Sequence, residues 1–74
     1  MSKLSPIPAR KVLKKLKRVG FIKIHQRGSH LTLKNEKDNR FVTIPMHSGD
    51  IPVGTLYNIV VNQAGLFIAD FNEL

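Results

Sequence analysis

The chain has 74 residues, no cysteine and a formal net charge of +7. This length predicts a single domain over residues 1–74 with one modest core, which favours a surface site made of a few side chains over a buried active site. The lack of cysteine excludes disulfides, thiolate metal sites and thiol nucleophiles. No apolar run is long enough for a signal peptide or a membrane span, so we expect a cytoplasmic protein without membrane contact.

The first predicted element is a helix over residues 9–19. Pro8 suits the first turn of a helix, because its missing N–H is not needed there, and Gly20 suits the left-handed residue that ends one. Apolar residues follow the i, i+1, i+4, i+7 spacing of one helix face, and nearly all other positions are Lys or Arg. We therefore expect one cationic face, a frayed segment over residues 1–7, and an apolar face made of Val12, Leu13, Leu16 and Val19.

Three short antiparallel strands are predicted after this helix. In the second of them, residues 29–34, Leu31 and Leu33 alternate with polar residues, which is the period of a half-buried strand. We therefore expect the intervening residues, His30 and Thr32, to face away from the core. The first strand ends in a turn at Gln26-Arg27-Gly28 and contains Phe21, Ile22, Ile24 and Gln26.

The third strand is predicted over residues 40–44, after a polar turn at residues 35–39. It alternates in the same way, with Val42 and Ile44 pointing inward, and Pro45 ends it because proline cannot donate to a strand ladder.

A loop over residues 46–53 leads to a second predicted helix over residues 54–64, which Gly65 ends. Residues 68–73 are expected to add a last short turn. The predicted buried stripe of the second helix is Leu56, Ile59, Val60 and Ala64. The order of helix, three antiparallel strands and helix predicts an α+β fold, with a three-stranded antiparallel sheet packed on two helices.

A series of short motifs begins with Gly28-Ser29-His30 at the start of the second predicted strand. It continues with Leu31-Thr32-Leu33, Val42-Thr43-Ile44-Pro45-Met46-His47, Gly54-Thr55-Leu56 and Ile59. In this order and spacing the chain resembles the HicA toxin family, from about Pro8 to Phe71. The resemblance implies a double-stranded-RNA-binding-like fold and an mRNA interferase that inhibits translation without a cofactor. It also implies a partner antitoxin of the HicB type.

The resemblance assigns the catalytic role to His30. RNA is cut without metal when its own 2′-hydroxyl attacks the adjacent phosphorus, so an enzyme has to remove that proton and protonate the leaving 5′-oxygen. An imidazole can perform either step near neutral pH. The candidate supporting residues are Gly28 and Ser29. The missing side chain of Gly28 lets the backbone approach a phosphate, and the hydroxyl of Ser29 could form a hydrogen bond to one.

His25 and His47 are the candidates for the second proton transfer, although either could be a plain surface side chain. His47 also matches a histidine often found in the family. No metal site is predicted, because the three histidines are separated by 5 and 17 positions without a cysteine or a neighbouring carboxylate. No Gly-rich phosphate loop, carboxylate pair or Ser/His/Asp order is present.

The positive charge is concentrated in one half of the chain. Residues 1–34 carry ten basic and no acidic side chains, whereas residues 35–74 carry two basic and five acidic ones, so the halves have formal charges of +10 and −3. Such a field attracts polyanions, although a solvated surface would show the same count. The predicted RNA-binding residues are Lys11, Lys14, Lys15, Arg18, Arg27 and Lys34.

Two other functions fit the same pattern. One is a non-catalytic double-stranded-RNA-binding module, but residues 53–64 lack the Lys cluster with which such modules hold phosphates. The other is a protein-interaction unit that docks on an acidic partner. If the chain is a toxin, we expect its antitoxin to be acidic and to cover His30 and the cationic helix together. Sequence-specific DNA binding is not expected, because the second helix offers bases no Arg or Lys.

Overall fold

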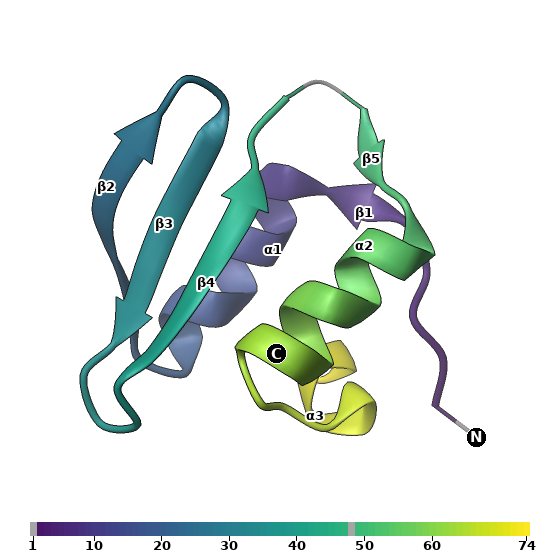
Figure 1. Cartoon of the computed structure of the whole chain (residues 1–74). Coiled ribbons are helices and arrows are strands. Elements are labelled where there is room, and N and C mark those ends of the chain that lie inside the picture. The colour runs from purple at the N-terminus through teal and green to yellow at the C-terminus, as the bar shows by residue number, and fades with distance from the viewer. Residues whose placement is uncertain (1, 48) are drawn as a thin grey trace.

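The computed structural model describes residues 2–47 and 49–74 (Figure 1). In chain order the elements are β1 (Ile7–Pro8), α1 (Ala9–Arg18), β2 (Phe21–Arg27), β3 (His30–Asn35), β4 (Arg40–Pro45), β5 (Asp50–Ile51), α2 (Val53–Tyr57), the π-helical segment η1 (Asn58–Gln63) and α3 (Ile68–Asn72). The main sheet is antiparallel, with the strand order β2-β3-β4. The predicted α+β arrangement is therefore confirmed.

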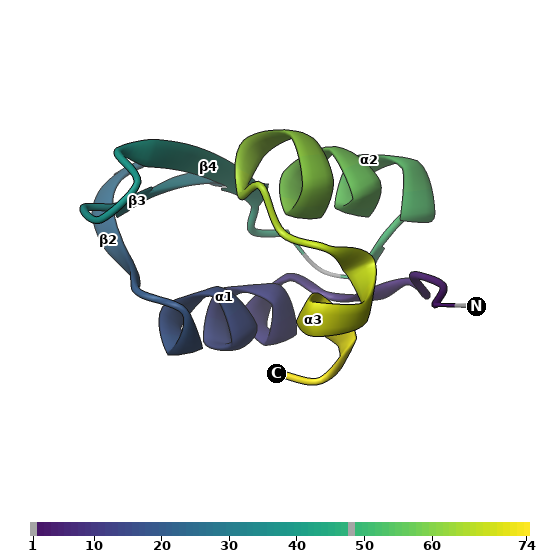
Figure 2. The same cartoon turned by 90° about the horizontal axis from the view of Figure 1, so that it is seen from below.

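The helices cover the sheet in two different ways. Figure 2 shows α1 lying across one face of the sheet, and α2 with η1 lying beside the β4 edge. In both views no described helix lies against the other face. We call this uncovered side of β2, β3 and β4 the open face.

The core fills the space between α1, the inner face of the sheet and the α2–η1 segment. On α1, Val12 and Leu16 are fully buried, whereas Leu13 and Val19 are only half-buried at the margin. Phe21 of β2 and Phe71 of α3 add two large buried rings. All the predicted inward residues of the strands and of the second helix are buried, namely Leu31, Leu33, Val42, Ile44, Leu56, Ile59, Val60 and Ala64.

Gly20 and the side chain of Asn35 shape the connection from α1 to β2. Gly20 has a φ of +102°, which confirms a left-handed residue after the helix. Asn35, expected in the polar turn, is instead the buried last residue of β3. Its Nδ2 donates to the carbonyl of Val19 at 3.1 Å, and its Oδ1 accepts the N–H of Lys37 at 3.1 Å. The side chain therefore ties the end of α1 to the β3–β4 turn.

The expectation of a frayed N-terminal segment is wrong for the residues nearest α1. Ile7 pairs with Ile51, so β1 and β5 form a two-stranded antiparallel sheet, of which β5 lies in the segment expected to be a loop. Leu4 packs against the core, and the carbonyl of Lys3 accepts a hydrogen bond of 2.7 Å from Asn72 Nδ2. These partners lie more than 40 residues away along the chain, beyond what a local pattern shows.

The second helix has the predicted extent and buried stripe but not a uniform geometry. After Tyr57 it widens into η1, where the N–H of Ala64 bonds the carbonyl of Ile59, five residues back, at 2.8 Å. Gln63 of η1 then reaches the exposed edge of β4, and its Oε1 accepts the N–H of Thr43 at 2.7 Å. The segment thereby covers part of a strand edge that would otherwise be unpaired.

Candidate nucleic-acid interface on the open face of the sheet

His30 is the first residue of β3 and lies directly after the two-residue turn of a hairpin. Gly28 has a φ of +59°, which a first turn residue needs and glycine adopts without strain. Gln26 Nε2 donates to the carbonyl of Gly28 at 3.2 Å, and the carbonyl of Ser29 accepts the backbone N–H of Met46. The turn is thus held by a side chain of β2 and by the residue that follows β4, and the side chain of His30 is exposed.

The register of the sheet defines what surrounds His30. Arg27 of β2 and Pro45 of β4 are its cross-strand partners, so all three side chains share the open face. Cβ atoms of such directly opposite residues lie about 4.5–5.5 Å apart, which puts the guanidinium of Arg27 within reach of any group bound at His30. The remaining open-face residues are Ile22, His25, Thr32, Lys34, Phe41 and Thr43.

A β-bulge in β2 decides which of its residues reach the open face. The pairing is regular at Ile22 and Lys23, then shifts by one residue before His25, which leaves Ile24 as the extra residue. Strict alternation from Ile22 would have turned His25 and Arg27 to the inner face. With the bulge, both lie on the same face as His30.

The far end of the open face combines a cation with exposed apolar groups. Lys34 lies between Ile22 and Phe41 in one cross-strand row, and its Nζ is 5.6 Å from the centre of the Phe41 ring. Ile22 and Phe41 are 46% and 51% exposed, so neither is part of the core. None of the open-face residues is acidic. An anionic strand with flat bases would meet no like charge on this face.

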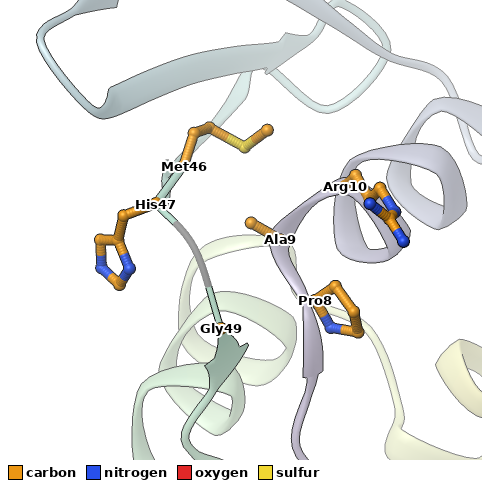
Figure 3. A pocket seen from close by; sticks show the side chains of 6 residues that line it. All are labelled: Pro8, Ala9, Arg10, Met46, His47 and Gly49. Atoms are coloured by element: carbon orange, nitrogen blue, oxygen red, sulfur yellow. The ribbon is translucent and has the colours of Figure 1, made fainter.

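His47 lies at the same end of the sheet as His30, two residues beyond Pro45. It is exposed and lines a surface pocket of about 200 Å³ between the start of α1 and the segment after β4 (Figure 3). In that view its ring points away from Ala9 and Arg10. The neighbouring Ser48 lies outside the described residues.

The cationic residues of α1 lie on the other side of the molecule from His30. Lys11, Lys14, Lys15 and Arg18 line a shallow pocket of about 260 Å³ with Leu74. They occupy the surface of α1 away from its buried residues, and α1 covers the inner face of the sheet. The structure therefore brings Arg27 and Lys34 onto the face of His30, but not the four predicted residues of α1.

Lys15 also has a structural role within this group. Its Nζ donates to the carbonyl of Phe71 at 3.1 Å and to that of Asn72 at 3.4 Å, and lies 4.8 Å from the centre of the Phe71 ring. The ammonium group thereby holds α3 against α1.

One protein family matches this chain, and the match runs from residue 9 to residue 66, which is most of its length. The family is described as the HicA toxin of bacterial toxin–antitoxin systems. The chain belongs to the HicA toxin family. A search among curated proteins found no match.

Membership makes the chain a toxin of a bacterial toxin–antitoxin system, whose counterpart is a cognate antitoxin. The matched region of this HicA-family toxin contains the whole open face and ends before α3. In the part of the chain that the structure describes, no helix is both long and apolar enough to cross a bilayer, and no three His, Asp or Glu side chains gather as ligands for a metal ion.

Two features of this interface, the exposed ring of Phe41 and the bulge at Ile24, are not among the residues that the sequence predicts for the site. The alternation over residues 40–44 places Phe41 outward, so its exposure could have been predicted from the sequence. The bulge at Ile24 has no local signal, because Ile22, Lys23 and Ile24 follow the ordinary alternation of apolar and polar residues in a strand.

Proposed function

We propose that this HicA-family toxin is an mRNA interferase that acts in the cytoplasm without a metal or other cofactor and inhibits translation by cutting mRNA. The observation that carries this proposal is the position of His30. It stands exposed at a hydrogen-bonded hairpin end, opposite Arg27, on a sheet face with basic and apolar but no acidic side chains. Single-stranded RNA is recognised by this combination of cations and exposed ring faces.

The proposed reaction uses the RNA as its own nucleophile. The 2′-oxygen forms a bond to the adjacent phosphorus while the bond from phosphorus to the 5′-oxygen breaks. His30 either accepts the 2′-hydroxyl proton or gives a proton to the leaving 5′-oxygen. Arg27, directly opposite, is suited to bind the phosphate oxygens as charge builds on them. Gly28 and Ser29 contribute through the turn that holds His30 in place.

The function is tested by incubating the purified protein with single-stranded RNA in the presence of EDTA. Release of defined cleavage products is the expected result. Binding of RNA without cleavage would favour the non-catalytic RNA-binding module instead, and a lack of both would favour a pure protein-interaction unit.

We expect the open face, rather than α1, to supply most of the electrostatic attraction at the site of cleavage. Each phosphate contact on single-stranded RNA contributes about 0.7 to the slope of log affinity against log salt, so replacing both Arg27 and Lys34 with Gln should reduce the slope by about 1.4. The measurement is fluorescence anisotropy of a short labelled RNA over a salt series, in the His30→Ala background to prevent cleavage.

The matched comparison is the triple variant Lys11→Gln, Lys14→Gln and Arg18→Gln, which removes more charge from the opposite side of the molecule. Lys15 is left intact because it holds α3. On a short RNA this variant should change the slope less than the open-face double variant. A larger change in the slope would mean that the RNA binds on α1, as the count of charges along the sequence predicts.

We also propose that the antitoxin is an acidic protein of the HicB type that covers His30, and that the complex leaves any sequence-specific DNA binding to that partner. The basic open face favours an acidic partner and association that slows as salt is added. Hydrogen exchange of the toxin co-purified with the product of the adjacent gene should show new protection at residues 28–30. Protection confined to residues 54–74, in a complex that still cuts RNA, would contradict coverage of His30.

A further inference from the structure

The bulge in β2 creates a second histidine position on the open face. The register places His25 opposite Thr32, and Thr32 is two residues along β3 from His30. His25 is therefore the diagonal neighbour of His30, whose direct partner is Arg27. Both histidine side chains are exposed.

The spacing of these positions suits one phosphodiester group. Diagonal neighbours in an antiparallel pair lie about 7–8 Å apart, close enough for long side chains to meet and far enough for a phosphate to lie between two rings. The direct neighbour of His30 contributes the guanidinium of Arg27 to the same space. Bulges commonly re-aim side chains beside active sites in this way.

We propose that His25 is the second acid–base residue of the RNA cleavage reaction, placed by the bulge at Ile24 so that it and His30 flank the scissile phosphate. This inference rests on the proposed function. As the bond from the 2′-oxygen to phosphorus forms, one imidazole accepts the 2′-hydroxyl proton. As the bond from phosphorus to the 5′-oxygen breaks, the other imidazole gives its proton to that oxygen. One proton is taken and one is given, so the reaction needs no further reactant.

The surroundings of His25 contain few other groups that could carry a proton. Its charged neighbours or neighbours with an acid–base side chain on the open face are Arg27, His30 and Lys34, of which only His30 carries an imidazole. Lys23 of the same strand points to the inner side, and the cations of α1 lie beyond the sheet. His47, the other sequence candidate, follows β4 and lies beside the start of α1.

The test is the pH dependence of kcat/KM on single-stranded RNA for the wild type, His25→Ala and His47→Ala. Two essential acid–base groups give a bell-shaped profile, and loss of one general acid or base lowers the rate by about 10²–10⁴-fold. We expect His25→Ala to show this loss, with one limb of the bell missing, an unchanged unfolding midpoint and partial rescue by added imidazole. His47→Ala should keep both limbs.

Lys23→Gln is the matched control, because it alters an exposed residue of the same strand on the other side of the sheet. Its profile should keep the wild-type shape. A folded His25→Ala variant with a complete bell, or loss of a limb in His47→Ala instead, would overturn the role of His25 while the wild type still cut RNA. Failure of the wild type to cut RNA would instead be a failure of the proposed function.

Discussion

Replacing His30 with Ala is expected to lower the rate of RNA cleavage by about 10²–10⁴-fold, the usual effect of removing one general acid or base. The effect should fall on kcat and leave RNA binding largely intact, because Arg27 and Lys34 remain on the open face. The fold should survive, since the His30 side chain is exposed and the turn before it is held by backbone and Gln26 contacts. Cleavage is measured on purified protein in EDTA, and folding by urea denaturation.

The control for this variant is Lys37→Ala, which alters an exposed side chain in the turn at the opposite end of β3. It should cleave RNA at a rate close to that of the wild type. Equal activity of a folded His30→Ala variant and the wild type would show that His30 is not a catalytic residue, independently of the roles of the other histidines.

The second large effect concerns stability. We expect Phe71→Ala to lower the free energy of unfolding by about 3–5 kcal/mol, because it deletes a fully buried ring and leaves a cavity. Phe71 packs α3 into the core, and its ring is also the partner of the Lys15 ammonium. In a chain of 74 residues such a loss is a large share of the total stability. The measurement is urea unfolding followed by circular dichroism.

Phe67→Ala provides a control of the same chemistry at the start of the same helix. The ring of Phe67 is 78% exposed, so its removal should change the free energy of unfolding by no more than about 0.5 kcal/mol. A loss for Phe71→Ala as small as that expected for Phe67→Ala would mean that the Phe71 ring does not hold α3 in the core.

The sequence by itself determined the elements whose pattern is local. The spacing of Val12 and Leu16 predicts the buried side of α1, and the alternation around Leu31 and Leu33 predicts both the inner face of β3 and the exposed position of His30. These predictions succeed because helix and strand periods are set by backbone geometry and because one hydrophobic face per element is enough to orient it. The order of motifs around Gly28-Ser29-His30 was likewise enough to predict the family.

Only the tertiary structure decided which side chains share a surface. Along the sequence the cations of α1 belong to one basic half with Arg27 and Lys34. In the fold α1 lies against the inner face of the sheet, so the core and the sheet separate the two groups. The bulge at Ile24 and the pairing of Ile7 with Ile51 were equally hidden. A bulge is selected by register against a neighbouring strand, and a β1–β5 pair by a partner far along the chain. Their energies depend on residues that no window of local sequence contains, and so the position of His25 beside His30 becomes visible only in the folded chain.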